Sequence, residues 1–382
     1  MKIGIDISRI TQKEKTGVEW YAYFLIAELK TLIAQMNKDY SDKKIDVILY
    51  TNKPLKGVFA ELPEGWQEKV LKWPPKRLWT HVRLSWEMLF HTPDVLFIPA
   101  HVVPLIHPKK TVMVVHDIAS TKFPNSYNWF ERWYSLWSVQ YALRHVWKII
   151  TPSIFTREEM TKTWKEGKQK NIIVIYHGYN THFNNIIDEK DKYMVMKKYG
   201  LQKPFIMSIG RLEKKKNTCK IIETFEMLKN NEQKIRKNVQ LLLVGKPGFG
   251  YEDIKEKIKH SEYKKDIKIP GWVDQEDLSI LLASADVFVF PSLYEGFGLP
   301  VLEAMACGTP VVASQGTSLE EVGGDAVTYV DPMSSDDIAS AILNVMNNEE
   351  YRKEQIKKGL ERVKEFSWER CARETLQVLC SD

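Results

Sequence analysis

The sequence lacks the features of a secreted, metal-binding or membrane-spanning protein. Its cysteines are few, and none of them is in C-x-x-C spacing, so neither a zinc site nor a disulfide framework is indicated. They are Cys219, Cys307, Cys371 and Cys380. No apolar run reaches the roughly 20 residues that cross a bilayer. The opening MKIGIDIS predicts a first strand and not a signal peptide, so a cytoplasmic protein is expected, with any membrane contact made at the surface.

Other features that the sequence lacks argue against further classes of protein. No G-x-G-x-x-G follows the first predicted strand, which argues against an NAD enzyme. There are no internal repeats and no low-complexity tracts, and no RNA- or DNA-binding motif is found, so nucleic acid is not an expected partner. The net charge of +6 is mildly basic and is compatible with nucleotides, lipid phosphates or membrane surfaces.

The chain is long enough for two domains, because 382 residues exceed the usual single core. Strand-like and helix-like segments alternate throughout, which predicts open parallel sheets with helices on both faces. The polar residues 181–203 show weak periodicity and are interpreted as the linker. We therefore expect domains at 1–185 and 200–366, with a long helix at 336–365 and a final helix at about 367–382.

The most informative stretch is DVFVFPSLYEGFGLPVLEAMACGTP, residues 286–310. An apolar strand, Val287–Phe290, is followed by a loop in which Gly296 and Gly298 flank Phe297. Leu299 then opens a helix with proline in its first turn, where the missing N–H costs nothing. Unpaired N–H groups and the helix dipole make such an N-terminus a site for phosphate.

Two carboxylates accompany this predicted phosphate site. Glu295 lies in the loop, and Glu303 lies about one turn inside the helix. Carboxylates beside phosphate suit a ligand that also carries hydroxyl groups, as a sugar nucleotide does. The alternative is a buried strand followed by a surface helix with a chance pair of glutamates.

A second loop carries the cations. The strand 204–209 runs into Gly210, Arg211 and, further on, Lys216, within GRLEKKKN. At the ligand edge of a parallel sheet, two cations can neutralise a diphosphate as it leaves. The alternative interpretation of the EKKK run is a solvated charged segment.

The first half of the chain contains candidate ligand-binding residues, but their patterns are less specific. Gly17 precedes a predicted helix at 18–35, and a ligand-facing loop and a plain helix start fit it equally. His116 ends a predicted strand and can contact a sugar hydroxyl or form a structural hydrogen bond with Asp117. Ten of the twelve tryptophans lie before residue 165. Core packing explains most of them, but their mixture with lysine and arginine also suits contact with lipid headgroups.

The segments EGFGLPVLEAMACGTPVV and GRLEKKKN resemble the signatures of the retaining GT-B glycosyltransferases, specifically their large fourth family (glycosyl transferases group 1). The resemblance extends over essentially the whole chain and is strongest over 204–331. It implies an α/β fold of two doubly wound Rossmann-like domains facing each other across a cleft, with the donor held by the second domain and the acceptor by the first. It also implies that the final helix, about 367–382, packs back on the first domain.

The resemblance also implies roles for individual residues. Arg211 and Lys216 stabilise the departing diphosphate, together with backbone N–H groups at Phe297 and Gly298. Glu295 holds sugar hydroxyls, Glu303 binds the ribose, and His116 contacts the sugar near the reacting face. The other donor-binding positions are Gly17, Gly210, Val273, Gly296 and Leu299.

The expected function is retaining transfer of a hexose, with mannose favoured, in surface polysaccharide synthesis. The donor is a GDP- or UDP-sugar, and the acceptor is lipid-linked or a saccharide. No cofactor and no metal are expected, and work at the inner face of the plasma membrane is one option. The alternatives are a nucleotide-sugar 2-epimerase, a disaccharide phosphorylase of the same fold, and a non-catalytic sugar-nucleotide-binding protein.

Overall fold

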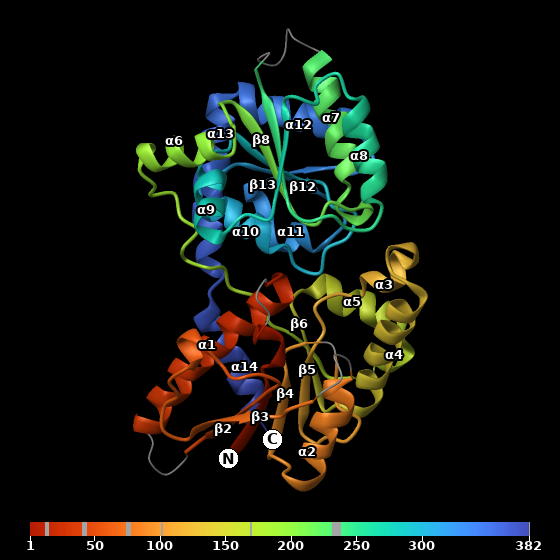
Figure 1. The fold of residues 1–382 in the computed structure, drawn as a ribbon, viewed down its shortest axis with the longest axis vertical. Helices are drawn as coiled ribbons and strands as arrows, with labels where there is room; N and C mark the ends of the chain where they lie inside the picture. Colours follow the sequence, from red (N-terminus) through yellow and green to blue (C-terminus); the bar gives the residue numbers. More distant parts are fainter. Residues whose placement is uncertain are drawn as a thin grey trace. The chain divides into compact units, whose positions relative to one another are not determined.

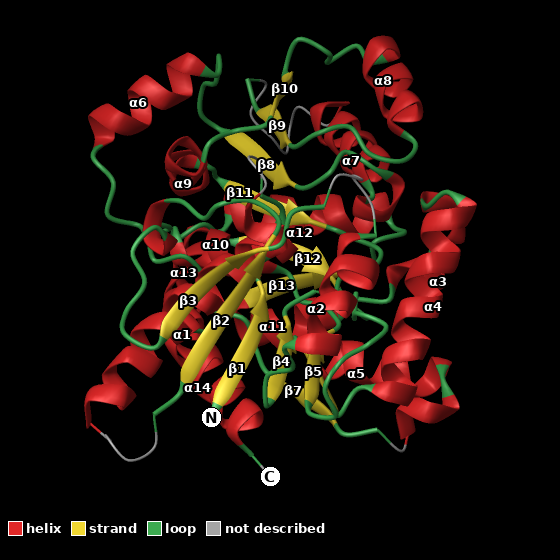
Figure 2. Cartoon of the chain, turned by 60° about the horizontal axis from the view of Figure 1, so that its bottom comes forward, coloured by secondary structure: helices red, strands yellow, loops and turns green. Residues whose placement is uncertain are grey.

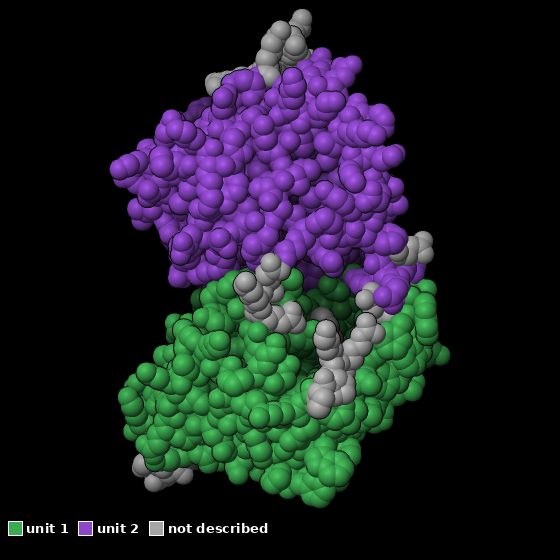
Figure 3. Space-filling model, in the orientation of Figure 1, with its two compact units in different colours: residues 1–122, 129–178, 366–382 green, residues 123–128, 179–365 purple. Residues whose placement is uncertain are grey.

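The computed structural model describes residues 1–11, 15–39, 44–73, 78–100, 102–168, 170–230 and 238–381. The chain forms two compact units, which are coloured separately in Figure 3. Unit 1 comprises residues 1–122, 129–178 and 366–382, and unit 2 comprises residues 123–128 and 179–365. Each unit contains one parallel sheet with helices packed against it (Figures 1 and 2).

Unit 1 has a seven-stranded sheet. Its strands are β1 (Lys2–Asp6), β2 (Asp46–Thr51), β3 (Trp66–Val70), β4 (Val95–Ile98), β5 (Thr111–Val114), β6 (Lys148–Thr151) and β7 (Ile172–Val174). Its α-helices are α1 (Gly17–Asp39), α2 (Ser85–Phe90), α3 (Ala119–Lys122), α4 (Trp129–His145), α5 (Ile154–Thr163) and α14 (Trp368–Cys380). A π-helical turn, η4 (Trp79–Leu84), leads directly into α2.

Unit 2 has a six-stranded sheet. Its strands are β8 (Phe205–Ile209), β9 (Gln240–Val244), β10 (Ile267–Gly271), β11 (Val287–Phe290), β12 (Val311–Ser314) and β13 (Val327–Val330). Its α-helices are α6 (Glu189–Lys198), α7 (Thr218–Asn230), α8 (Tyr251–His260), α9 (Gln275–Ser284), α10 (Leu299–Ala306), α11 (Ser318–Gly323), α12 (Ser335–Asn347) and α13 (Glu349–Arg362).

The two sheets share one topology. Their strand orders are β3-β2-β1-β4-β5-β6-β7 and β10-β9-β8-β11-β12-β13, and the paired strands are parallel throughout. In both sheets the order reverses beside the first strand, between β1 and β4 and between β8 and β11. Ligands of doubly wound sheets bind outside the carboxyl ends of the strands at such a switch point.

The core of unit 2 follows from nearly continuous apolar strands. Both β9 and β11 are buried along their whole length, as expected for parallel strands covered on both faces. Helices α7, α8 and α12 cover one face, with Ile222, Phe225 and Ile338 in that core, and α9 and α10 lie on the other (Figure 1). Helices thus cover both faces of the unit 2 sheet, and the ends of its strands are left for a ligand.

The last helix packs in unit 1 against the first. Trp368 stacks on Phe24 of α1 with ring centroids 5.6 Å apart. The chain passes into the main part of unit 2 after Gly178 and returns to unit 1 at Phe366. A Cβ on Gly178 would lie 2.2 Å from the backbone nitrogen of Trp368, so only glycine permits this approach.

Some predicted elements are wrong in detail. The single helix expected over 336–365 is two helices, α12 and α13, separated at Asn348, whose side chain caps α13 by accepting from the Tyr351 amide. Helix α6 occupies part of the expected linker, 181–203. Asp274 is the N-cap of α9, and its side chain forms no cap hydrogen bond. The side chain of Ser367, in contrast, caps α14 by accepting from the Arg370 amide. No helix in the described residues is long and apolar enough to span a bilayer.

Candidate functional site

The loop after β8 brings two predicted cations to the switch point of unit 2. Gly210, with φ of 150°, donates its amide to the carbonyl of Val244 at 2.9 Å. The Leu212 amide donates to the Lys246 carbonyl at 2.9 Å, which ties this loop to the loop after β9. Arg211 is exposed, and its guanidinium forms no ion pair within the described part of the chain.

Asn217 ends this loop and fastens it to two others. Its backbone is left-handed, with φ of 59°, a conformation that asparagine tolerates better than most residues. Its side-chain amide donates to the carbonyls of Pro291 at 3.1 Å and Pro332 at 2.7 Å. Helix α7 begins at the next residue. One side chain therefore holds together the loops that follow β8, β11 and β13.

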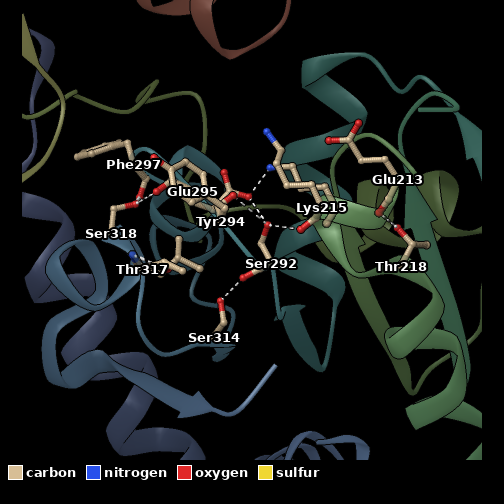
Figure 4. Close-up of polar contacts among 12 residues, drawn as sticks. Glu213, Lys215, Thr218, Ser292, Tyr294, Glu295, Phe297, Ser314, Thr317 and Ser318 are labelled. Atoms are coloured by element: carbon tan, nitrogen blue, oxygen red, sulfur yellow. Dashed lines mark hydrogen bonds and ion pairs between the residues drawn. The ribbon is translucent and has the colours of Figure 1, made fainter. Parts of the chain in front are cut away.

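The loop after β11 lies directly against this first loop (Figure 4). The amide of Leu293 donates to the carbonyl of Lys215 at 2.9 Å. Lys216 forms an ion pair with Glu295, and the hydroxyl of Ser292 donates to the same carboxylate at 2.5 Å. The carboxylate of one loop thus meets the ammonium of the other at the switch point.

This ion pair is partly shielded from solvent. The side chains of Lys216 and Glu295 are 19% and 11% exposed, and the ammonium lies 4.9 Å from the ring centre of Phe290. A charge pair in such a setting interacts more strongly than one on an open surface. Of the two predicted phosphate-binding cations, Lys216 is therefore held in place by Glu295, and Arg211 extends into solvent.

The N-terminus of α10 lies next in the chain. Gly298 is its N-cap with φ of 110°, and a Cβ there would lie 2.3 Å from a methyl carbon of Leu319. The hydroxyl of Ser318 lies 2.9 Å and 3.0 Å from the carbonyl oxygens of Glu295 and Phe297, which fixes the turn (Figure 4). The predicted order of strand, glycine loop and helix N-terminus is present.

Glu303 lies one turn inside α10, and burial raises the pKa of its carboxyl group to about 7. Within the described residues no hydrogen bond or ion pair reaches this carboxyl group from another side chain. A carboxyl with this pKa is partly protonated at neutral pH, and a hydroxyl-bearing ligand that donates to it would favour the ionised form.

The loop after β10 contains Val273, one of the predicted donor-binding residues. Val273 is 5% exposed, whereas the neighbouring Trp272 is 42% exposed. The ammonium of Lys246 lies 5.3 Å from the ring centre of Trp272. The exposed aromatic surface beside this loop therefore belongs to Trp272.

The two remaining predicted residues, His116 and Gly17, belong to unit 1. His116 is 7% exposed, and its Nε2 lies 3.0 Å from the carbonyl oxygen of Pro99. A carbonyl can only accept, so Nε2 carries the proton in this contact. The ring centroid of Tyr21 is 4.7 Å away and that of His177 is 5.5 Å away. Gly17 is the first residue of α1, and no described atom lies within 4 Å of the position of a Cβ there.

The structure thus brings most of the predicted donor site together at one edge of unit 2. Lys216 and Glu295 touch directly, and Gly210 lies against the Lys216 side chain. Gly296, Phe297, Gly298, Leu299 and Glu303 continue from Glu295 along the same loop and helix. Sequence reasoning missed the supporting side chains, which are Asn217, Ser292, Ser314 and Ser318. The available signal was that each of these polar residues lies at the end of a strand, in the loop that follows one or at the start of the next helix, between Ile209 and α7 or between Phe290 and the first residue of α11.

Two family models match the chain. The model described as "Glycosyl transferases group 1" matches residues 189–362, and "Glycosyltransferase Family 4" matches residues 17–183. The chain belongs to the group 1 glycosyltransferases, and the family expected from the sequence is confirmed.

Curated relatives agree with this assignment. An O-antigen chain mannosyltransferase B of Escherichia coli is 29% identical over 80% of this chain and 77% of that protein. The O-antigen chain mannosyltransferase RfbU of Salmonella typhimurium is 23% identical over 89% of this chain and 90% of that protein. The expected class of enzyme, a hexosyltransferase, is confirmed.

Solved structures show the same fold. Sucrose-phosphate synthase from Thermosynechococcus elongatus matches with a TM-score of 0.74 at 19% identity, covering 99% of this chain and 98% of the other. The glycosyltransferase WaaG, involved in lipopolysaccharide biosynthesis, gives 0.72 at 13% identity over the whole of both chains. Anabaena HepE, in complex with UDP and glucose, gives 0.71 at 18% identity, again over the whole of both chains. The GT-B fold class is therefore confirmed.

Proposed function

We propose that this enzyme transfers mannose from a nucleoside diphosphate donor, with retention of anomeric configuration, to a saccharide or lipid-linked acceptor in surface polysaccharide synthesis. The observation that carries the proposal is the meeting of Lys216 and Glu295 at the switch point of unit 2, beside Arg211 and the N-terminus of α10. The O-antigen mannosyltransferase relatives support the choice of mannose as the sugar and of surface polysaccharide synthesis as the process.

The cations have a direct chemical use in this reaction. As the bond between the anomeric carbon and the diphosphate oxygen breaks, negative charge develops on the leaving group. Arg211 extends into solvent and can reach a bound phosphate, and Lys216 is already oriented by Glu295. In the proposed reaction both side chains bind the phosphates, and the N-terminal amides of α10 add positive potential. These groups take the place that a divalent cation holds in other sugar-nucleotide enzymes.

The same geometry favours attack on the face that the diphosphate leaves. A double displacement needs a carboxylate free to bond the anomeric carbon. Glu295 is instead engaged by Lys216 and Ser292, which suits a role in holding sugar hydroxyls. In the proposed step the acceptor oxygen bonds the anomeric carbon, the bond to the diphosphate breaks, and a phosphate oxygen receives the acceptor proton. Glu303 receives hydrogen bonds from the ribose.

The donor is tested by thermal shift with a panel of nucleotide sugars, because a ligand that binds only the folded state raises the melting temperature. We expect GDP-mannose to give a larger shift than UDP-glucose. NMR of the product made from the preferred donor reports the anomeric configuration. An inverted product contradicts the retaining mechanism. Donor conversion without any acceptor indicates epimerisation, and binding without turnover indicates a non-catalytic protein.

A lipid-linked acceptor would place the enzyme at a membrane surface. We propose peripheral contact at the inner face of the plasma membrane, from a cytoplasmic enzyme. The support is the apolar outer surface of unit 1, where Trp86 and Trp129 are 62% and 81% exposed.

A further inference from the structure

The two oxygens of the Glu295 carboxylate have different surroundings. Its Oε1 accepts both from the Lys216 ammonium and from the Ser292 hydroxyl. Its Oε2 forms no hydrogen bond or ion pair with the described part of the chain, and it remains accessible to solvent. The side chain as a whole is only 11% exposed. One oxygen of this carboxylate is therefore fixed by the protein, and the other is available to a ligand.

The hydroxyl of Ser292 has one proton to donate, and the geometry directs this proton to Glu295. The carboxylate Oε1 lies 2.5 Å away, whereas the carbonyl oxygens of Lys215 and Tyr294 lie 3.2 Å and 3.5 Å away. The charged acceptor at the shortest distance forms the strongest of these bonds. Ser292 therefore donates to the carboxylate and not to the backbone of its own loop.

The position of Ser292 is itself fixed from two sides. The residue is fully buried, and its carbonyl accepts from the hydroxyl of Ser314, at the end of β12, at 2.5 Å. The next amide, that of Leu293, donates at 2.9 Å to the carbonyl of Lys215 in the loop after β8. Figure 4 shows Ser292 between Ser314 and Glu295. A side chain locked in this way can orient the group that it contacts.

Lys216 differs from Ser292 in having donors to spare. An ammonium group carries three N–H donors, and Glu295 is the one hydrogen-bond acceptor that Lys216 meets among the described residues. Further donors thus remain for the phosphates of the proposed donor. Ser292 has no second proton, so any contribution that it makes to ligand binding passes through Glu295.

We infer that Ser292 is a positioning residue, which holds Glu295 so that Oε2 accepts a hydrogen bond from one hydroxyl group of the donor sugar. The inference rests on the proposed function in taking a nucleotide sugar as the ligand. A sugar without this hydroxyl leaves the oriented oxygen unpaired, and sites built around such a bond reject the deficient analogue strongly. Ser292 therefore contributes to selection of the sugar and not to affinity for the nucleotide.

The test uses monodeoxy analogues of the preferred nucleotide sugar, assayed with the unmodified enzyme and with Ser292→Ala. One analogue should lower kcat/KM of the unmodified enzyme about 100-fold or more, because it lacks the hydroxyl that donates to Oε2. Ser292→Ala should lower kcat/KM for the complete sugar about tenfold or more, since a hydrogen bond to a charged group is lost. With that one analogue, the variant and the unmodified enzyme should differ less than about threefold, because the two losses are coupled.

A second measurement needs no turnover. The contribution of the sugar is the difference between the melting temperature with the nucleotide sugar and that with the nucleoside diphosphate alone. Ser292→Ala should lose most of this difference and keep the shift that the diphosphate gives. Ser292→Cys retains a side chain with a weak donor, so its value should lie between those of serine and alanine.

A matched control is Ser284→Ala on α9 of the same unit. Ser284 is also fully buried, but its hydroxyl donates to the Ile280 carbonyl of its own helix at 2.7 Å. This variant should keep the sugar-dependent shift and the response of the unmodified enzyme to every analogue. Circular dichroism of all variants without ligand confirms that each is folded.

Three results overturn the inference. They are unchanged kcat/KM in Ser292→Ala, losses that multiply for every analogue, and loss of diphosphate affinity equal to the loss of nucleotide-sugar affinity. The outcome is separable from the proposed function. A sugar-dependent shift that Ser292→Ala removes, in a protein that transfers no sugar, leaves the positioning role standing and removes the function. Glycosyl transfer with multiplying losses does the reverse.

Discussion

The carboxyl ends of the two sheets occupy the same topological position but carry different chemistry. In unit 2 the switch point is polar and charged, with Lys216, Glu295 and Ser292 in mutual contact. In unit 1 the strand ends lead to a buried aromatic cluster, in which the ring centroids of Tyr21 and His116 are 4.7 Å apart. The fold supplies a place for a ligand in both units, and the side chains decide whether that place can hold a diphosphate.

The strongest test of this difference between the units is to remove the two cations of unit 2. Lys216→Ala and Arg211→Ala should each lower kcat roughly 100-fold or more, because preorganised positive charge on a leaving group contributes on this scale. The measurement is steady-state turnover with the preferred nucleotide sugar.

Lys214→Ala is the matched control from the same loop. Its ammonium pairs with Asp253 at 2.8 Å on an exposed surface, so its turnover should stay within about twofold of the unmodified enzyme. Unchanged turnover in both the Lys216 and Arg211 variants would remove the leaving-group role from unit 2.

The glycines at the starts of α10 and α1 extend the comparison of the two units to stability. Gly298→Ala should lower the free energy of unfolding on the order of 3 kcal/mol, because a Cβ would meet Leu319 and the backbone is left-handed. Gly17→Ala should change it by less than about 0.5 kcal/mol, since the space is open. Urea unfolding of both variants measures the difference. Equal effects would show that the two glycines have the same structural role.

The pH dependence of stability tests Glu303. Its ordinary pKa is 4.5 and burial raises it to about 7. Within this window the folded protein keeps a proton that the unfolded chain releases, so stability falls as pH rises from 4.5 to about 7 and then levels off. The loss is at most about 3 kcal/mol.

Glu303→Gln keeps the neutral shape and should remove this decline. Melting temperatures of the variant and the unmodified protein should therefore diverge as pH rises and converge near pH 4.5. If nucleotide binding uses the carboxylate, GDP or UDP affinity should also rise with pH more steeply in the unmodified protein. Parallel melting curves across the whole range would show that Glu303 is not the titrating group.

The smallest expected effects on stability come from removing one buried hydroxyl group in each unit. Tyr21 is 1% exposed and its hydroxyl has no hydrogen-bond partner in the described structure, so Tyr21→Phe should be neutral or slightly stabilising. Ser314 donates to the Ser292 carbonyl at 2.5 Å, and Ser314→Ala should destabilise by about 1–2 kcal/mol. Thermal denaturation distinguishes the two. A destabilised Tyr21 variant would reveal a partner in the unit 1 cluster.

The sequence allowed the switch-point loop to be predicted because local rules agree there. Val287–Phe290 is uniformly apolar, glycine and proline mark the turn and the helix start, and the charged residues stand between them. The partners of Asn217 and Ser292 could not be predicted in this way. They bond to loops that are distant in sequence, and those contacts depend on which strands are neighbours in the sheet.

The missed elements have a related explanation. Strand β3 is at the edge of its sheet, and Gln67 and Glu68 face solvent, so its sequence lacks the continuous apolar run of a central strand. Helix α6 buries only Val195, which leaves almost no periodic signal. The break at Asn348 depends on a side-chain cap, which the apolar pattern does not show.

The return of the chain to unit 1 has a consequence for synthesis on the ribosome. Helix α14 supplies Trp368, which packs on Phe24 near the start of the chain. The first unit therefore cannot complete its core until α14 emerges, whereas unit 2 lies entirely between Phe24 and Trp368 in the sequence. Protein domains generally fold in the order of their translation. Here the unit translated first is finished last, because Phe24 of α1 lacks its Trp368 partner until α14 has been made.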